Sequence, residues 1–199
     1  MFISISLILY TGHNEFIDKY LTFTFLKEHP LISSIFLVIT ELGSIEAILL
    51  ISTLLLVLLW LQRKIKLLLL FLCLSIGGLI LNITLKMLFQ RDRPGELSEI
   101  EAFGQSLEIV SYSFPSGHTM RSVILLLFIL YLLQTMQRGL IRNILFSTTV
   151  FFLIAVPLSR IITGAHFPSD VLAAIFISIS WFCLCLFISN KPNTFSYKA

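Results

Sequence analysis

Long apolar runs alternate with short polar segments along most of the chain. Five of these runs are long enough, or nearly so, to cross the hydrocarbon core of a membrane, which takes about 20 helical residues. They lie at approximately Gly43–Leu61, Leu67–Phe89, Thr119–Leu133, Asn143–Ile162 and Val171–Ser189. The pattern predicts an all-α fold, an integral membrane helical bundle with five to six transmembrane helices.

The first 42 residues depart from this pattern. The run Phe2–Tyr10 has only nine residues, about 14 Å of helix, and it lacks the basic flank and the cleavage site of a signal peptide. We interpret it as a shortened first span, or as the start of a longer one. The segment His13–Thr40 mixes charges with an amphipathic pattern, which is typical of a helix at the membrane interface. We therefore expect one membrane-embedded domain over residues 1–199, with these two segments in 1–42 and the core spans in 43–189.

The composition also indicates a membrane protein. Hydrophobic residues make up 57% of the 199 residues, and charged residues make up only 13%. Water-soluble domains have about 25% charged residues, so this chain belongs in a bilayer. The net charge of +3 is small and scattered, which does not favour nucleic acid as a partner. The three cysteines, Cys73, Cys183 and Cys185, lie within apolar runs, and we interpret them as packing residues.

The charged residues indicate how the chain crosses the membrane. The turns at 62–66 and 134–142 and the tail after Ser189 hold seven basic residues and no acidic one. All eleven acidic residues fall toward the opposite side of the predicted spans. Because short loops rich in Lys and Arg stay cytoplasmic, we expect a multi-pass protein of the cell membrane with cytoplasmic basic loops and C-terminus. The other face would be external.

Polar residues that are not ordinary loop residues form three clusters on the predicted external side. The first is KMLFQRDRP, from Lys86 to Pro94. Lys86 and Arg93 are seven residues apart, two helical turns, so a continuing helix would project both side chains to one side. The alternative is that each side chain extends to the lipid headgroups.

The second cluster is FPSGH, which precedes a long apolar run. Proline is favoured in the first turn of a helix because the N–H that it lacks would have no partner there. A helix that begins here would leave the amides of Ser116, Gly117 and His118 free, and such amides form an anion site. The alternative is a plain helix cap.

The third cluster is SRIITGAHFPSD, from Ser159 to Asp170. Pro168 predicts a helix start that places Asp170 in the first turn, where the helix dipole favours a charged carboxylate. Asp170 follows His166 by four residues, so it can accept a hydrogen bond from one imidazole nitrogen. The other nitrogen then keeps its lone pair, as a nucleophile requires. The alternative is a capped helix with an interfacial histidine.

Together, the clusters bring cations, bases and a carboxylate to the same end of four spans. The cations are Lys86, Arg93 and Arg160, the bases are His118 and His166, and the carboxylate is Asp170. This set fits a phosphate group and contains its own nucleophile. No second carboxylate accompanies Asp170 in the sequence to complete a magnesium site, so we expect neither a metal nor a cofactor.

The chain resembles the type-2 phosphatidic acid phosphatases, which are related to the vanadium haloperoxidases. The family pattern is K-x6-R-P, then P-S-G-H, then S-R-x5-H-x3-D, and all three parts are present in order between Lys86 and Asp170. With its span plan, the resemblance extends over approximately residues 31–189. The family's membrane members usually have six full spans, whereas the first is stunted here.

The resemblance implies a role for each matching residue. Phosphate oxygens would be bound by Lys86, Arg93, Arg160, Ser116 and the Gly117 amide. His166 would attack phosphorus, Asp170 would orient it, and His118 would protonate the leaving oxygen and later activate water.

These residues lead to the hypothesis of a metal-independent phosphatase acting on the phosphate or diphosphate of a membrane lipid at the external face, through a phosphohistidine intermediate. Candidate substrates are undecaprenyl diphosphate, phosphatidylglycerol phosphate and phosphatidic acid. The alternatives are a membrane transporter or a lipid-binding protein with a non-catalytic anion site. A transporter would place its polar groups near the middle of its spans. A haloperoxidase would hold vanadate in the same cluster, but those relatives are soluble.

Arg121 is not part of the family pattern. It lies three residues after His118, so the two side chains would be neighbours on a helix. A cation at this position could bind the second phosphate of a diphosphate. The alternative is that Arg121 extends to the headgroups, or pairs with Glu108 or another loop acid.

Overall fold

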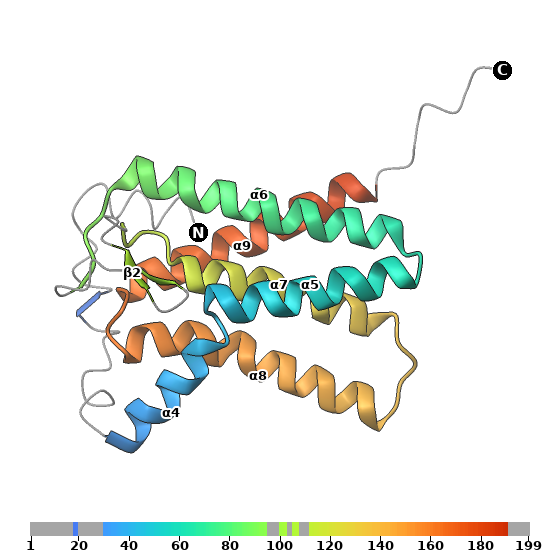
Figure 1. The fold of residues 1–199 in the computed structure, drawn as a ribbon, viewed down its shortest axis with the longest axis horizontal. Coiled ribbons are helices and arrows are strands. Elements are labelled where there is room, and N and C mark those ends of the chain that lie inside the picture. The colour runs from blue at the N-terminus through green and yellow to red at the C-terminus, as the bar shows by residue number, and fades with distance from the viewer. Residues whose placement is uncertain (1–17, 20–29, 95–99, 103–104, 108–111, 191–199) are drawn as a thin grey trace.

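The structure of the protein, a computed structural model, describes residues 18–19, 30–94, 100–102, 105–107 and 112–190. These residues form a bundle of helices with a short antiparallel hairpin at one end (Figure 1). The helices are α4 (Pro30–Glu41), α5 (Ile45–Leu61), α6 (Ile65–Phe89), α7 (Gly117–Gln134), α8 (Leu140–Ile162) and α9 (Pro168–Ser189), and the strands are β1 (Ile100–Ala102) and β2 (Gln105–Leu107). The fold class expected from the sequence, a helical membrane bundle, is confirmed.

Each apolar run that was predicted to span the membrane is a helix, within a few residues of its expected bounds. In the described part of the chain, four helices are long and apolar enough to cross a membrane, namely α6, α7, α8 and α9. α4 and α5 meet at an angle of 43° and make a fifth candidate span if the bent pair counts as one. Of the expected interfacial segment, the structure describes residues 18–19 and, from Pro30 on, helix α4, and the run Phe2–Tyr10 lies outside the described residues.

α7 is the central helix of the bundle. It packs against α5, α6, α8 and α9. In its most apolar stretch, 50% of the residues are buried inside the protein, compared with 28–33% for the other three spans. A residue at the start of α7 can therefore contact several other helix ends at once.

The bundle is apolar both inside and outside. Phe128 of α7 and Phe71 of α6 are buried together, with their ring centroids 4.7 Å apart. Large apolar side chains such as Leu54, Trp60 and Phe151 are exposed on the outer surface. Such a surface suits contact with hydrocarbon, in which apolar side chains are favourable.

α6 and α9 approach each other closely at small residues. A Cβ atom added to Gly77 would lie 2.3 Å from Cζ2 of Trp181, so only glycine fits here. The indole Nε1 of Trp181 donates to the carbonyl of Leu74 at 3.2 Å. Nearby, the free thiols of Cys73 and Cys185 are in contact, with their Sγ atoms 3.9 Å apart.

The two ends of the bundle differ in what they carry (Figure 1). The α5–α6 turn, the α7–α8 loop and the end of α9 lie at one end, which holds the basic turns. The end of α6, the start of α7, the end of α8 and the start of α9 lie at the opposite end, together with the hairpin. We call this second end the site end. The alternating direction of the helices thus brings segments distant in sequence to one place.

Candidate functional site

The site end gathers residues from each of the three sequence clusters. Lys86 lies in the last turn of α6, His118 in the first turn of α7, Arg160 in the last turn of α8, His166 in the α8–α9 loop and Asp170 in the first turn of α9. The predicted helix start at Pro168 is confirmed, because α9 begins there.

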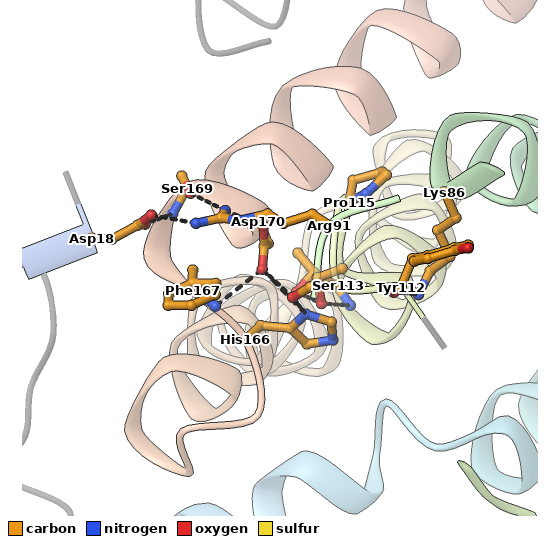
Figure 2. A network of polar contacts seen from close by, with 12 residues as sticks. Asp18, Lys86, Arg91, Tyr112, Ser113, Pro115, His166, Phe167, Ser169 and Asp170 are labelled. Atoms are coloured by element: carbon orange, nitrogen blue, oxygen red, sulfur yellow. Dashed lines mark hydrogen bonds and ion pairs between the residues drawn. The ribbon is translucent and has the colours of Figure 1, made fainter. Parts of the chain in front are cut away.

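The carboxylate of Asp170 is fully buried and accepts hydrogen bonds on both oxygens (Figure 2). Its Oδ2 accepts from the hydroxyl of Ser113 and, at 3.1 Å, from the backbone N–H of Phe167. Its Oδ1 accepts from Nη1 of Arg91 at 2.6 Å. These donors stabilise the charged form of a carboxylate that burial alone would neutralise.

The imidazole of His166 faces this arrangement with its Nδ1 atom. Nδ1 lies 3.2 Å from Oγ of Ser113 and 3.6 Å from Oδ2 of Asp170, so Ser113 is the closer partner. The single hydroxyl hydrogen of Ser113 is donated to Asp170, and a carboxylate only accepts. Nδ1 must therefore carry the hydrogen of the imidazole, which leaves the lone pair on Nε2.

A tight turn fixes the backbone of His166. α8 ends at Ile162, and Gly164 follows with φ of 72°, a left-handed conformation that favours glycine. The amides of Ala165 and His166 both donate to the carbonyl of Arg160, at 3.1 and 3.2 Å. The nucleophile candidate is thus held directly beneath the last turn of α8.

His166 is a neutral base at physiological pH. Burial lowers the pKa of His166 from its ordinary value of 6.5 to about 4, although Asp170 acts in the opposite direction. The charges of Arg160 and Arg93 lower the pKa of His166 further. Nε2 of His166 therefore stays unprotonated, while Nδ1 keeps its hydrogen.

Three buried polar atoms stand out among the described residues. They are Nε of Arg121, Nε of Arg160 and Nε2 of His166, and each lacks a hydrogen-bond partner within this part of the protein. All belong to the site end. They supply two N–H donors and one lone pair, which is the combination that a phosphate group can use. Buried polar groups are normally satisfied, so this concentration points to a ligand site.

Contacts of the Nη atoms orient the guanidinium groups of Arg160 and Arg121. Nη1 of Arg160 donates to Oγ1 of Thr40 at 2.7 Å, which ties α8 to α4. Nη2 of Arg121 lies 3.5 Å from Nδ1 of His118, and a Cβ atom on Gly117 would lie 3.3 Å from its Nη1. Arg121 therefore turns toward the start of α7 instead of extending away from it.

The start of α7 differs in two respects from the sequence expectation. Ser116 is the N-cap residue, so Pro115 precedes the helix instead of lying in its first turn. The amide of Ser116, which was expected to be free, donates to the carbonyl of Asp170 at 3.2 Å, so that prediction is wrong. The amides of Gly117 and His118 remain first-turn amides, which have no carbonyl partner within their own helix.

The end of α6 also differs from the expectation. The helix ends at Phe89, and Gln90 adopts a left-handed φ of 44°, so Arg93 does not lie two helical turns beyond Lys86. The shared helical register was therefore a wrong prediction. Nevertheless, Arg93 joins the same cluster: burial lowers its pKa, and the charge of Asp170 opposes this shift.

α6 also supports the loop that precedes α7. Nζ of Lys86 donates to the carbonyl of Tyr112 (Figure 2). One turn earlier, Nδ2 of Asn82 donates to the carbonyl of Pro115 at 3.2 Å. An ammonium group has three N–H donors, so Lys86 can hold this loop and still bind a second acceptor.

Three residues around Asp170 were not predicted from the sequence, namely Ser113, Arg91 and Asp18. Ser113 lies next to the FPSGH cluster and Arg91 lies within KMLFQRDRP, but neither position has a spacing that marks it. Asp18 is 151 residues from its backbone partner Ser169, so no local pattern could reveal it. It also supplies the second carboxylate near Asp170 that was not foreseen, with Arg91 paired to both.

The fold is that of a multi-pass membrane protein, and cations, histidines and a carboxylate gather at one end of its spans. The family model described as the PAP2 superfamily matches residues 66–193, and the chain belongs to this superfamily. The family resemblance inferred from the motifs is thereby confirmed. A comparison with curated proteins finds no match.

Two solved structures share the fold. The first transmembrane PAP2 type phosphatidylglycerolphosphate phosphatase from Bacillus subtilis is 22% identical, with a TM-score of 0.69 over 98% of each chain. LpxE from Aquifex aeolicus is 23% identical, with a TM-score of 0.58 over 89% of this chain and 94% of that one.

The protonation state of His166 can be measured directly. Because its pKa is lowered to about 4, His166 should stay neutral from about pH 8 to about pH 5.5, whereas an ordinary histidine would gain a proton over this range. Its hydrogen should reside on Nδ1. Nitrogen-15 NMR of histidine-labelled protein in detergent micelles reports both properties, and a His166→Asn spectrum identifies the resonances.

Two serine variants provide the control for this measurement. Ser113→Ala should weaken the preference for the Nδ1 hydrogen, because Ser113 is its nearest acceptor. Ser178→Ala removes an equally buried hydroxyl that donates to the carbonyl of Ala174, and it should leave His166 unchanged. Titration of His166 near pH 6.5, or a hydrogen on Nε2, would contradict the geometry.

Proposed function

We propose that the protein is a phosphatase that hydrolyses the phosphate or diphosphate of a membrane lipid. The observation that carries this proposal is the set of unpartnered buried atoms at the site end, Nε of Arg121 and Arg160 beside the neutral Nε2 of His166. Membership of the PAP2 superfamily supports it, as does the fold shared with the transmembrane phosphatidylglycerolphosphate phosphatase from Bacillus subtilis.

The reaction proceeds in two displacements at phosphorus. Nε2 of His166 attacks in line and the bond from phosphorus to the leaving oxygen breaks. His118, which takes up a proton when the anionic phosphate binds beside it, gives that proton to the leaving oxygen. The phosphohistidine is then hydrolysed: water gives a proton to His118, its oxygen bonds to phosphorus, and the bond to Nε2 breaks. Both histidines return to their starting states.

Charge stabilisation accounts for the remaining residues of the site. Lys86, Arg93 and Arg160 bind the phosphoryl oxygens, with Ser116 and the Gly117 amide at the start of α7. Phosphoryl transfer depends mainly on positioning and on charge stabilisation, which fixed cations in a buried site provide. Through Ser113, Asp170 stabilises the cationic ring that forms when His166 is phosphorylated.

The proposal requires neither a metal nor a cofactor. Among the described residues, Asp170 and Asp18 are carboxylates that lie close together beside His166, and the guanidinium of Arg91 is paired with both. Their charge is therefore already compensated by a side chain. Cations that bind phosphate in place of magnesium are supplied by lysine and arginine.

The nucleophile is tested by replacing His166. His166→Ala should lower phosphate release to less than about a hundredth of the wild-type rate and abolish an acid-labile phosphoenzyme. His118→Ala should slow release from ordinary lipid phosphates but be partly rescued by a substrate with an acidic leaving group. The assay uses purified protein in detergent and a panel of lipid phosphates and diphosphates, with excess EDTA present.

Three outcomes would contradict this mechanism. Substantial turnover by His166→Ala would remove it as the nucleophile. Loss of activity in EDTA that magnesium restores would refute metal independence. Tight binding of lipid phosphates by wild-type protein without turnover would indicate a non-catalytic anion site.

Arg121 supports a role for diphosphates among the substrates. Its guanidinium lies beside His118, the proposed acid, and therefore on the side of the leaving group. When the terminal phosphate of a lipid diphosphate is attacked, the leaving group is itself a phosphate. Arg121 is placed to bind that second phosphate, whereas the leaving alcohol of a lipid monophosphate offers it no charge.

This role predicts a change in substrate preference. Arg121→Met should lower kcat/KM for a polyprenyl diphosphate by about tenfold or more, equivalent to about 1.4 kcal/mol, and leave a lipid monophosphate nearly unaffected. Arg142→Met, at the opposite end of the bundle, is the matched control and should change neither substrate. Equal losses on both substrates would assign Arg121 a structural role.

The charge pattern of the loops supports an external position for the site end. We therefore expect a single cysteine at Asp92 to react with a membrane-impermeant thiol reagent on intact cells, and one at Gln137 to be protected. Both positions are exposed and lie at opposite ends of the bundle. The three native cysteines are first replaced by serine. The reverse labelling would place the site in the cytoplasm.

A further inference from the structure

Arg91 contacts several residues around His166, and no spacing in the sequence predicts these contacts. Its Nη1 donates to Oδ1 of Asp170 at 2.6 Å and to Oγ of Ser169 at 2.7 Å, and its Nη2 donates to Oδ2 of Asp18 at 2.6 Å. The guanidinium also stacks over the ring of Phe167, 4.1 Å from its centroid. Figure 2 shows Arg91 between the two carboxylates.

The backbone of Arg91 holds the other partner of His166. Its carbonyl accepts from the amide of Ser113 at 2.6 Å. Arg91 therefore fixes Asp170 through its side chain and Ser113 through its main chain. These are the two residues whose oxygens face Nδ1 of His166, at 3.6 and 3.2 Å respectively.

Asp18 anchors Arg91 from the amino-terminal side. One carboxylate oxygen binds Nη2 of Arg91, and the other accepts from the amide of Ser169 at 3.0 Å, in the first turn of α9. The Asp18 side chain is 9% exposed and that of Arg91 is 13% exposed, so neither contact is a solvated surface pair. Asp18 thus binds both Arg91 and the helix that carries Asp170.

We propose that Arg91 and Asp18 form a positioning pair that holds Ser113 and Asp170 against Nδ1 of His166, so that Asp18 belongs to the active site. The proposal rests on the function proposed above for His166. Neither residue touches the phosphate; they act through the groups that orient the nucleophile. Asp18 thereby contributes to catalysis, although it lies far from the three clusters along the sequence.

Variants that change the charges of Arg91 and Asp18 can distinguish their ion pairing from ordinary packing. In Arg91→Gln, the carboxylates of Asp18 and Asp170 remain in a buried place without the cation between them. Two buried carboxylates this close cannot both stay ionised. Either Asp18 moves away from Asp170, or one of the two carboxylates takes up a proton. Replacing Asp18 by Asn in the same chain removes that repulsion. Adding Asp18→Asn should therefore raise the activity of the Arg91→Gln variant. A simple loss of packing would not produce such a recovery.

The test measures the kinetics of four variants. The substrate is the lipid diphosphate or monophosphate on which wild-type protein is most active. Arg91→Gln should lower kcat about 100-fold and Asp18→Asn about tenfold, each with little change in KM, because binding of the phosphate is untouched. The double variant Arg91→Gln/Asp18→Asn should be at least about fivefold more active than Arg91→Gln alone. Asp92→Asn, an exposed acid in the same loop, is the matched control and should retain wild-type kcat.

A second measurement is independent of catalysis. The nitrogen-15 resonances of His166 should lose their Nδ1-hydrogen signature in Arg91→Gln and recover it in part in the double variant. If wild-type protein hydrolyses no lipid phosphate, the proposed function fails, and these resonances still test the link from Arg91 to His166. Unchanged resonances in Arg91→Gln would overturn the link.

Three further results would also overturn the proposal. Wild-type kcat in Asp18→Asn would remove Asp18 from the pair. Variants that melt at lower temperature in detergent but keep their kcat while folded would show that the network supports stability alone. A double variant no better than Arg91→Gln would refute the charge balance between the carboxylates.

Discussion

The charged carboxylate of Asp170 lies buried at the end of an apolar bundle, and the arrangement of the site end depends on how that charge is balanced. Removing one partner of a buried ion pair typically costs about 3–5 kcal/mol, because it strands the other charge. Here Arg91, Ser113 and the Phe167 amide all donate to Asp170, and they come from the segments after α6, before α7 and before α9. Balancing one charge therefore joins three helix ends.

The backbone reinforces this junction. The amide of Ser116 donates to the carbonyl of Asp170, and the amide of Ser113 donates to the carbonyl of Arg91. The segment that begins α7 is therefore fixed between the end of α6 and the start of α9. In the proposed mechanism this segment carries Ser116, the phosphate-binding amide of Gly117 and the acid His118, so their position relative to His166 follows from the same contacts.

A membrane explains why this chemistry lies at one end of the helices. Each span must be apolar to cross the hydrocarbon core, so ionisable groups are tolerated chiefly near the helix ends or where they are paired. A lipid keeps its phosphate at the surface and its chains among the spans. A site at the helix ends therefore suits a lipid headgroup, whereas a transporter would need polar groups near the middle of the membrane.

Some buried polar atoms at the site end have hydrogen-bond partners, and others have none among the described residues. Asp170 has a donor on each oxygen, and Nδ1 of His166 has an acceptor. The buried side-chain atoms that lack a partner in the described part of the chain, Nε2 of His166 and Nε of Arg121 and Arg160, lie at the same end. A rigid, satisfied set of side chains next to reactive, unsatisfied atoms is the arrangement that preorganised catalysis requires.

The amino-acid sequence by itself determined the spans, the helix start at Pro168 and the gathering of His118, His166 and Asp170 at one end, because hydropathy, proline position and helix direction are local properties. It could not determine that α6 stops at Phe89 and removes Arg93 from the helical register, nor that the Ser116 amide is already bonded. Only the tertiary structure placed Ser113 between His166 and Asp170, and Arg91 between Asp170 and Asp18. These contacts join residues up to 151 positions apart, and a contact between distant segments depends on packing, which leaves no periodic signal in the chain.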